Sequence, residues 1–233
     1  MGILYIVATP IGNLQDITLR AIEILKKVDY IASEDTRRTG SLLKSLNVEK
    51  KHFLISYYDQ NELMRIPSIL AVLKEGQDVA LVSDAGTPTI SDPGFKLVRA
   101  CAEAGIRVES IPGASSVISA LASSGLPTDK FVFLGYLPHK PGKREKMLKD
   151  IEATTQIIKS TVILFEAPHK IIRTLEEMLA VFGDIQVVLA RELTKMHEEI
   201  LRDTISNLLY HFEKRNPKGE FVLLFNRGEQ TDE

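Results

Sequence analysis

The sequence predicts an α/β fold with two domains, and three observations support this prediction. In the first half of the chain, short apolar runs alternate with amphipathic stretches of helical period. Near residues 112–113 small residues take over, in GASSVISALASSGLPTD, and a second alternating series then begins. Alternation in the first half is typical of a mainly parallel sheet with helices on its faces. We therefore predict an N-terminal α/β domain over residues 1–113 and a C-terminal α/β domain over residues 114–233.

The first half contains apolar runs that suit strands buried on both faces of a sheet. These strands are expected at residues 3–8, 30–33, 52–56, 79–83 and 107–111. Asp16 can cap a helix over residues 18–27, and Pro93 suits the first turn of another helix, which would run to residue 104. The remaining helices of this half are expected at residues 39–46 and 62–74.

The second half repeats the alternation without repeating the sequence. Its strands are expected at residues 131–135, 161–165, 186–191 and 220–225, and its helices at residues 144–158, 170–182 and 204–213.

The composition excludes several classes of protein. Of 233 residues, 44% are apolar and 26% are charged, which is ordinary for a soluble protein. A net charge of −2 leaves only a local basic patch for binding nucleic acid. The single cysteine, the lack of a long apolar run and the absence of a signal-peptide pattern predict a cytoplasmic protein without membrane contact. The five histidines are widely spaced, so we expect no metal site.

Three loops follow predicted strands and contain glycine, proline and hydroxyl residues. They read ATPIGNLQD (8–16), SDAGTPTISDPG (83–94) and PGASS (112–116). In open α/β sheets ligands bind outside the carboxyl ends of strands. Each loop alone suits a turn or a helix cap, but three together favour a pocket. Neither common nucleotide-binding glycine motif is present, so these residues alone predict only a small polar ligand.

Longer motifs extend the interpretation to the whole chain. In order they are LYIVATPIGNLQDITLRAIEIL, EDTRRTGSLL, LVSDAGTPTISDPG, IPGASS, FLGYLPHKPGKRE, FEAPHKI and ARELTKMHE. Together they resemble the ribosomal RNA small subunit methyltransferase I family. That family methylates the 2′-hydroxyl of a cytidine in 16S rRNA and belongs to the tetrapyrrole methylase superfamily of class III S-adenosylmethionine-dependent methyltransferases.

The resemblance implies a tetrapyrrole methylase-like fold with S-adenosyl-L-methionine folded into a cleft between the two halves. The first two loops here read TPIGN and SDAGTP, whereas the wider superfamily usually has G-x-G-x-G and G-D-P. For Ile11 and Ala167, plain core packing is an equal alternative. The positions that the resemblance assigns to the cofactor are Pro10, Ile11, Asp84, Thr87, Ser115, Ser116 and Ala167.

Charged residues in the strand-end loops are the candidates for catalysis. A ribose hydroxyl needs a base or a polarising cation to become a good nucleophile. The candidates are Glu34, Asp35, Arg37, Glu166, Arg191, Glu192 and Lys195. The resemblance favours them because they belong to its motifs, although such pairs are often solvated ion pairs. We expect Asp35 or Glu192 as the base, and Arg37 or Lys195 near the hydroxyl or a phosphate.

The segment HKPGKREKMLK (139–149) carries the densest positive charge. Phosphate neutralisation dominates RNA affinity, so Lys140, Lys143, Arg144 and Lys146 are predicted to contact RNA, although an exposed basic helix start is often only a soluble surface. The resemblance also implies a homodimer acting on the small ribosomal subunit. Two other functions stay open: methylation of a tetrapyrrole ring, such as a precorrin or uroporphyrinogen, and an RNA-associated binding module without catalysis.

Overall fold

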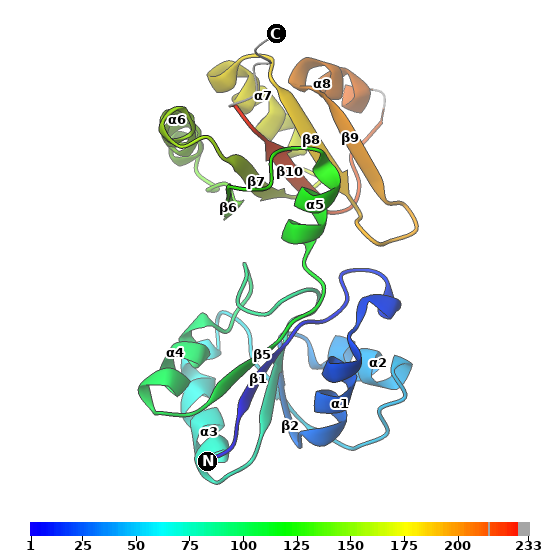
Figure 1. Ribbon diagram of the computed structural model, residues 1–233, viewed down its shortest axis with the longest axis vertical. Coiled ribbons are helices and arrows are strands. Elements are labelled where there is room, and N and C mark those ends of the chain that lie inside the picture. Colours follow the sequence, from blue (N-terminus) through cyan, green and yellow to red (C-terminus); the bar gives the residue numbers. More distant parts are fainter. Residues whose placement is uncertain (214, 228–233) are drawn as a thin grey trace. The chain divides into compact units, whose positions relative to one another are not determined.

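The structure of the chain is a computed structural model that describes residues 1–213 and 215–227 (Figure 1). The chain divides into two compact units, of which the first is Met1–Ser115 and the second begins at Ser116. Each unit contains one five-stranded sheet with helices packed against it. The predicted α/β class is therefore confirmed.

The sheet of the first unit is entirely parallel across its described pairings. Its strand order is β3-β2-β4-β1-β5, which places β1 between β4 and β5. Leu4 of β1 lies opposite Val79 of β4 and Val108 of β5. The strands are β1 (Leu4–Val7), β2 (Tyr30–Ser33), β3 (Phe53–Ser56), β4 (Val79–Val82) and β5 (Val108–Ile111).

Helices cover both faces of this sheet because successive strand residues point to opposite sides. Tyr5 and Val7 pack with residues of α1 and α2, whereas Leu4 and Ile6 pack with residues of α3 and α4. This explains why all four β1 residues are buried. The helices are α1 (Leu19–Lys27), α2 (Thr36–Ser45), α3 (Glu62–Lys74) and α4 (Phe95–Glu103).

Three predicted helix starts in the first unit are wrong, and one of them is that of α2, which begins at Thr36 rather than near residue 39. Thr18, not Asp16, caps α1, because its hydroxyl accepts the Ala21 N–H at 3.1 Å. Asp16 instead ends a short 3₁₀ turn, η1 (Leu14–Asp16). Helix α4 begins at Phe95 rather than at Pro93, since Gly94 is its N-cap with a φ of +133°.

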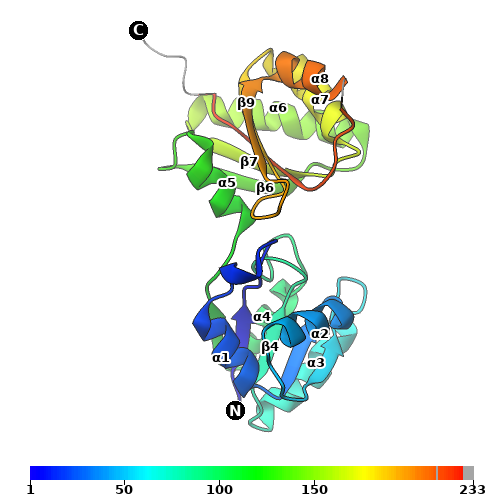
Figure 2. The same cartoon turned by 90° about the vertical axis from the view of Figure 1, so that its right-hand side faces the viewer.

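The sheet of the second unit is mixed. Its order is β6-β7-β10-β8-β9, in which β6 and β7 are parallel and the other neighbours antiparallel. The strands are β6 (Phe131–Tyr136), β7 (Thr161–Glu166), β8 (Gln186–Arg191), β9 (Glu199–Thr204) and β10 (Phe221–Phe225). Helices α6 (Pro141–Ile157), α7 (Ile171–Phe182) and α8 (Ile205–Glu213) share a buried core with one face of this sheet. Helix α5 (Ser116–Ser124) contacts β10 and β8 (Figure 1). In Figure 2, α5 lies on the other side of this sheet from α6, α7 and α8.

The sequence did not predict α5 or β9 as elements of this unit. Helix α5 is built of small residues, SVISALASS, whose pattern resembles a linker. Strand β9, EILRDT, is an edge strand with no fully buried residue, so it lacks the apolar run of an inner strand. The Arg202 guanidinium of β9 donates to the Ser124 carbonyl at 2.8 Å, which fixes the end of α5 to the sheet edge.

Candidate functional site

The three glycine-containing loops meet at the carboxyl edge of the first sheet. They follow β1, β4 and β5, which are neighbours in that sheet, so the fold places them side by side. Thr9 and Gly86 exchange two backbone hydrogen bonds, at 2.9 and 3.0 Å. The Thr87 hydroxyl donates to the Ala114 carbonyl at 3.2 Å. The predicted convergence of these loops is therefore present within the first unit.

Two glycines lie where the loops pack closely against one another. Gly86 has a φ of +82°, and a Cβ there would lie 3.4 Å from Ile11 Cγ2 and 4.0 Å from the Ala114 oxygen. A Cβ on Gly113 would come within 3.0 Å of the Ala8 Cβ. The three loops are therefore in close contact here, and a side chain at Gly113 would require Ala8 to shift. We call this place the loop cradle, defined by residues 8–11, 84–87 and 113–115.

The residues assigned to the cofactor fall into both units. Pro10, Asp84, Thr87 and Ser115 are partly exposed at or beside the loop cradle, and Ile11 is buried there. Two others belong to the second unit: Ser116 is the first residue of α5, and Ala167 follows β7.

Asp84 connects the cradle to the loop after β2. Its Oδ1 accepts the Asp35 N–H at 3.1 Å, and its Oδ2 pairs with Arg38 Nη1 at 3.1 Å. A carboxylate has about four acceptor positions, so Asp84 keeps capacity for a further donor. Neither Arg38 nor Thr9 was predicted from the sequence as a residue of the site. The adjacent arginines in EDTRR were the available signal for Arg38, because they follow a strand next to β4.

Asp35, one of the two carboxylates predicted as the base, is the N-cap of α2. Its Oδ1 accepts the Arg37 N–H at 2.9 Å, and its Oδ2 pairs with Arg37 Nη2 at 2.7 Å. These contacts with Arg37 hold the pKa of Asp35 well below its usual range. A carboxylate held in this way is a weak proton acceptor.

The neighbouring Glu34 has the opposite electrostatic setting. Burial raises the pKa of its carboxyl group, and the negative charges of Asp84, Asp92 and Asp59 raise it further, against the lowering effect of Arg38. Glu34 therefore accepts a proton more readily than Asp35, one residue away in the same loop.

Glu192, the other predicted base, lies in a compact ion pair of the second unit. Its Oε1 accepts the Glu220 N–H at 2.9 Å and the Lys195 ammonium at 3.0 Å, and Lys195 also pairs with Glu220 Oε2 at 2.9 Å. Burial opposes ionisation of Glu192, but the Glu220 N–H and the Lys195 ammonium outweigh it and lower the pKa of Glu192. The same carboxylates raise the pKa of Lys195 against the effect of burial.

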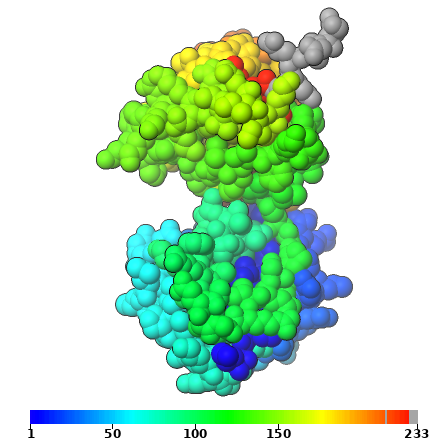
Figure 3. Space-filling model, turned by 60° about the vertical axis from the view of Figure 1, so that its left-hand side comes forward, coloured from blue at the N-terminus to red at the C-terminus, as the bar shows by residue number. Residues whose placement is uncertain are grey.

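Three of the four cations predicted to contact RNA lie at the surface. Lys140, Lys143 and Lys146 are exposed around the first turns of α6, and the described residues place no carboxylate within ion-pairing distance of them. The yellow-green atoms of this region form part of the surface of the second unit (Figure 3). We call these three the α6 lysines.

Arg144, the fourth cation predicted to contact RNA, is buried, unlike the three α6 lysines. It is only 2% exposed, and its Nε donates to Glu177 Oε2 at 2.6 Å. Its Nη2 donates to the Thr174 hydroxyl at 2.7 Å. Because this guanidinium is buried and already has internal partners, we do not include Arg144 among the proposed RNA contacts.

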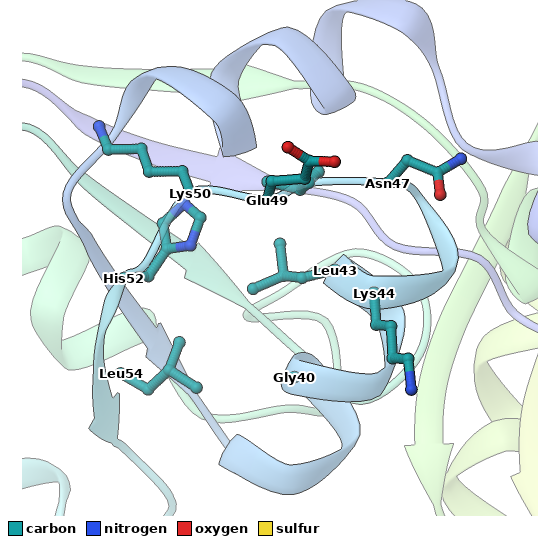
Figure 4. Close-up of a pocket in the computed structure, with 9 residues that line it drawn as sticks. Gly40, Leu43, Lys44, Asn47, Glu49, Lys50, His52 and Leu54 are labelled. Carbon is teal, nitrogen blue, oxygen red and sulfur yellow. The ribbon is translucent and has the colours of Figure 1, made fainter.

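A cavity of about 390 Å³ lies away from the loop cradle, between the second half of α2 and β3 (Figure 4). Its apolar lining includes Leu43 and Leu54. The Lys50 ammonium on its rim is already paired with Asp29 at 2.8 Å, and His52 Nε2 is hydrogen-bonded to the Leu25 carbonyl at 2.7 Å. We assign no ligand to this cavity.

Within residues 1–213 and 215–227, no group of His, Cys, Asp and Glu is arranged to hold a metal ion. No helix in the described part of the chain is both long enough and apolar enough to cross a membrane.

Comparison with known proteins places the chain in a family. The family model of the tetrapyrrole (corrin/porphyrin) methylases matches residues 3–209. A protein of Synechocystis sp. named ribosomal RNA small subunit methyltransferase I is 50% identical over 96% of this chain and 78% of its own length. A Thermotoga maritima protein of the same name is 46% identical over 97% of this chain and 99% of its own length.

The chain belongs to the ribosomal RNA small subunit methyltransferase I family. The resemblance of the sequence motifs is thereby confirmed over nearly the whole chain.

Solved structures agree on the fold. Uroporphyrin-III-C-methyltransferase from Thermus thermophilus has a TM-score of 0.64 at 21% identity, covering 96% of this chain and 94% of its own. Cobalt precorrin-4 methyltransferase has a TM-score of 0.66 at 20% identity, covering 95% of this chain and 94% of its own. At such identities the likeness confirms the tetrapyrrole methylase-like fold of this member of the methyltransferase I family, and no more.

Proposed function

We propose that this chain transfers a methyl group from S-adenosyl-L-methionine to the ribose 2′-hydroxyl of a cytidine in 16S rRNA. The observation that carries the proposal is the set of relatives named ribosomal RNA small subunit methyltransferase I, at 46–50% identity over 96–97% of the chain. The tetrapyrrole alternative has no comparable support, because the two tetrapyrrole enzymes compared above are only 20–21% identical to this chain.

The loop cradle suits such a cofactor. Gly86 lets the loop backbone approach Ile11 closely, Asp84 retains acceptor capacity for hydroxyl or ammonium donors, and Ile11 contributes apolar packing beside them. We propose that Pro10, Ile11, Asp84, Thr87 and Ser115 of the first unit, with Ser116 and Ala167 of the second, hold the cofactor. When bound, S-adenosylmethionine would supply a methyl group already activated by its sulfonium.

The protein side of the reaction then consists of alignment and proton removal. Holding two reactants in line replaces an encounter in solution, which is a large part of catalysis by enzymes. Among the candidate carboxylates, Glu34 suits the base best because its pKa is raised, whereas the pKa values of Asp35 and Glu192 are lowered. We propose Glu34 as the base, with Arg37 or Lys195 close to the ribose hydroxyl or a phosphate.

The α6 lysines are the proposed RNA-binding surface. Exposed ammonium groups without carboxylate partners can neutralise phosphates and release counterions. The RNA is proposed to be the small ribosomal subunit or its 16S rRNA, which implies a cytoplasmic location. We keep the homodimer as a prediction that sedimentation of the purified chain can test.

The test supplies labelled S-adenosylmethionine and small ribosomal subunits from cells that lack this methyltransferase. We expect one labelled cytidine whose phosphodiester bond resists alkaline cleavage, as a 2′-O-methyl group requires. Label in a uroporphyrinogen or precorrin, but not in RNA, would support the tetrapyrrole function instead. Cofactor binding without transfer to either substrate would indicate a binding module.

A further inference from the structure

A buried polar network in the second unit has no part in the proposed chemistry. It consists of Arg144, Glu166, Thr174 and Glu177, and the first three are 2%, 3% and 0% exposed. Burying a guanidinium and a carboxylate together removes both from water, and such pairs often stabilise a fold no more than apolar residues would. Stability alone is therefore a weak explanation for this network.

The network connects the first turn of α6 to the backbone after β7. The Arg144 guanidinium donates to Thr174 Oγ1 at 2.7 Å, and Thr174 Oγ1 donates to Glu166 Oε2 at 2.5 Å. The other oxygen of Glu166 accepts the Ala167 N–H at 2.9 Å. Every polar atom along this path has a partner, so a shift of α6 would break a bond at each step.

The two ends of this path are two proposed ligand sites. The first turns of α6 carry the α6 lysines, and Ala167 is a proposed cofactor contact. A second link joins the same segments at the surface, where Lys170 Nζ lies 3.1 Å from His139 Nδ1.

The positive charges near the N-terminus of α6 are electrostatically unfavourable. A helix N-terminus carries partial positive charge, so cations there are unfavourable. Helix α6 has no side-chain cap hydrogen bond and no acidic residue in its first turn, yet Lys143 and Lys146 lie near this end. Arg144 is a further cation at this end, but its bonds to Glu177 and, through Thr174, to Glu166 bring two carboxylates there, and these offset the repulsion.

We propose that Arg144 is a positioning residue that holds the α6 lysines in a fixed place relative to the Ala167 loop. It thereby sets where RNA phosphates lie with respect to the cofactor site without touching either ligand. This role rests on the proposed RNA methyltransferase function, and in it Arg144 affects RNA binding through the position of the α6 lysines.

The test compares Arg144→Met and Thr174→Val with Arg173→Met. Thr174→Val keeps both charges and nearly the same shape, so it remains informative if Arg144→Met fails to fold. Arg173 is the matched control, because its side chain is half exposed and pairs with the same Glu177 at 2.8 Å. We expect the dissociation constant for a 16S rRNA transcript to rise at least tenfold in Arg144→Met, several-fold in Thr174→Val and less than twofold in Arg173→Met.

A double-mutant cycle separates positioning from direct contact. In a chain in which the three α6 lysines are changed to alanine, adding Arg144→Met should not weaken RNA binding further. A further loss, additive with that of the lysines, would overturn the positioning role in favour of direct contact. Unchanged RNA binding in folded Arg144→Met would overturn it as well.

Hydrogen exchange gives a readout that does not depend on activity. Amides of residues 140–147 and 166–170 should exchange faster in Arg144→Met and Thr174→Val, and at the wild-type rate in Arg173→Met. Wild-type exchange rates in both network variants would overturn the proposal. If the wild-type chain itself bound neither RNA nor cofactor, the proposed function would fail, and the exchange rates would still decide whether Arg144 anchors the two segments.

Discussion

Thr9 and Gly86 form an isolated antiparallel β-bridge, in which each residue donates its backbone N–H to the carbonyl of the other. This pairing joins the loop after β1 to the loop after β4, and Gly86 makes it with a φ of +82°. Only glycine adopts such a conformation at no steric cost. The pairing thus depends on the residue type at position 86.

Replacing Gly86 with alanine should impair both folding and cofactor binding. The left-handed backbone costs an L-residue about 1–2 kcal/mol of unfolding free energy. The new methyl group would also lie 3.4 Å from Ile11 Cγ2, inside the loop cradle. We expect the dissociation constant for S-adenosylmethionine, measured by calorimetry, to rise about tenfold, which is about 1.4 kcal/mol.

Gly76→Ala is the matched control for this change. Gly76 also has a positive φ, +92°, but a Cβ there would meet nothing within 4 Å. Both variants should lose similar stability in urea, whereas cofactor affinity should fall only in Gly86→Ala. Equal affinity losses in the two variants would show that the effect is general destabilisation and not an intrusion into the cradle.

Glu62 should stabilise the first unit in a pH-dependent way. Its Oε1 accepts the Tyr57 hydroxyl at 2.8 Å and the Gly94 N–H at 2.9 Å, and its Oε2 pairs with Lys96 at 2.9 Å. Burial opposes ionisation, but these donors outweigh it and lower the pKa of Glu62. The folded-state pKa therefore lies below the unfolded value of about 4.3.

A lowered pKa gives a contribution that is present above the unfolded pKa and is lost as the pH falls through the folded pKa. Glu62→Gln should therefore cost about 1–3 kcal/mol near pH 7, with the difference shrinking below about pH 4. Urea titrations at several pH values measure this difference in unfolding free energy.

Lys96→Met, which removes only a half-exposed ammonium, should cost less than about 1 kcal/mol. A pH-independent difference for Glu62→Gln would contradict the ionic origin of the effect.

The first unit could be predicted largely from local sequence. Each inner strand is a continuous apolar run and each is followed by a helical pattern, so parallel pairing and loops at one sheet edge follow directly. The convergence of residues 8–16, 83–94 and 112–116 needs only that β1, β4 and β5 be neighbours.

The role of Arg144 could not be predicted in the same way. In a run such as KPGKREKMLK every cation has the same local pattern, and only tertiary packing decides which one is buried. Its partner Glu177 lies 33 residues away in the sequence, and no local pattern joins them. The raised pKa of Glu34 likewise depends on burial and on Asp84, Asp92 and Asp59, which no local pattern places beside it.

Glu34→Gln should abolish most methyl transfer while leaving cofactor binding nearly unchanged. Loss of a general base typically costs about 100-fold or more in rate. An ordinary glutamate has a pKa of about 4.3. Because the pKa of Glu34 is raised, the activity of the wild-type chain should begin to fall at a higher pH than a base of ordinary pKa would give. The variant should lack this acidic decline. Asp35→Asn, which preserves an acceptor at the helix cap, serves for comparison, and a greater loss there would favour Asp35 as the base.

The α6 lysines should account for the salt dependence of RNA binding. Each phosphate contact that is removed lowers the slope of log K against log salt by about one for duplex and about 0.7 for single strands. Lys143→Met should therefore weaken binding to 16S rRNA and reduce this slope by about 0.7 to one.

Lys149→Met is the matched control, because Lys149 on the same helix is already neutralised by Glu145 at 2.7 Å. In Lys149→Met the slope of log K against log salt should change little, since a paired ammonium displaces fewer counterions from RNA. Filter-binding titrations between low and moderate salt separate the two variants, and equal slopes for Lys143→Met and the wild-type chain would remove the α6 lysines from the RNA interface.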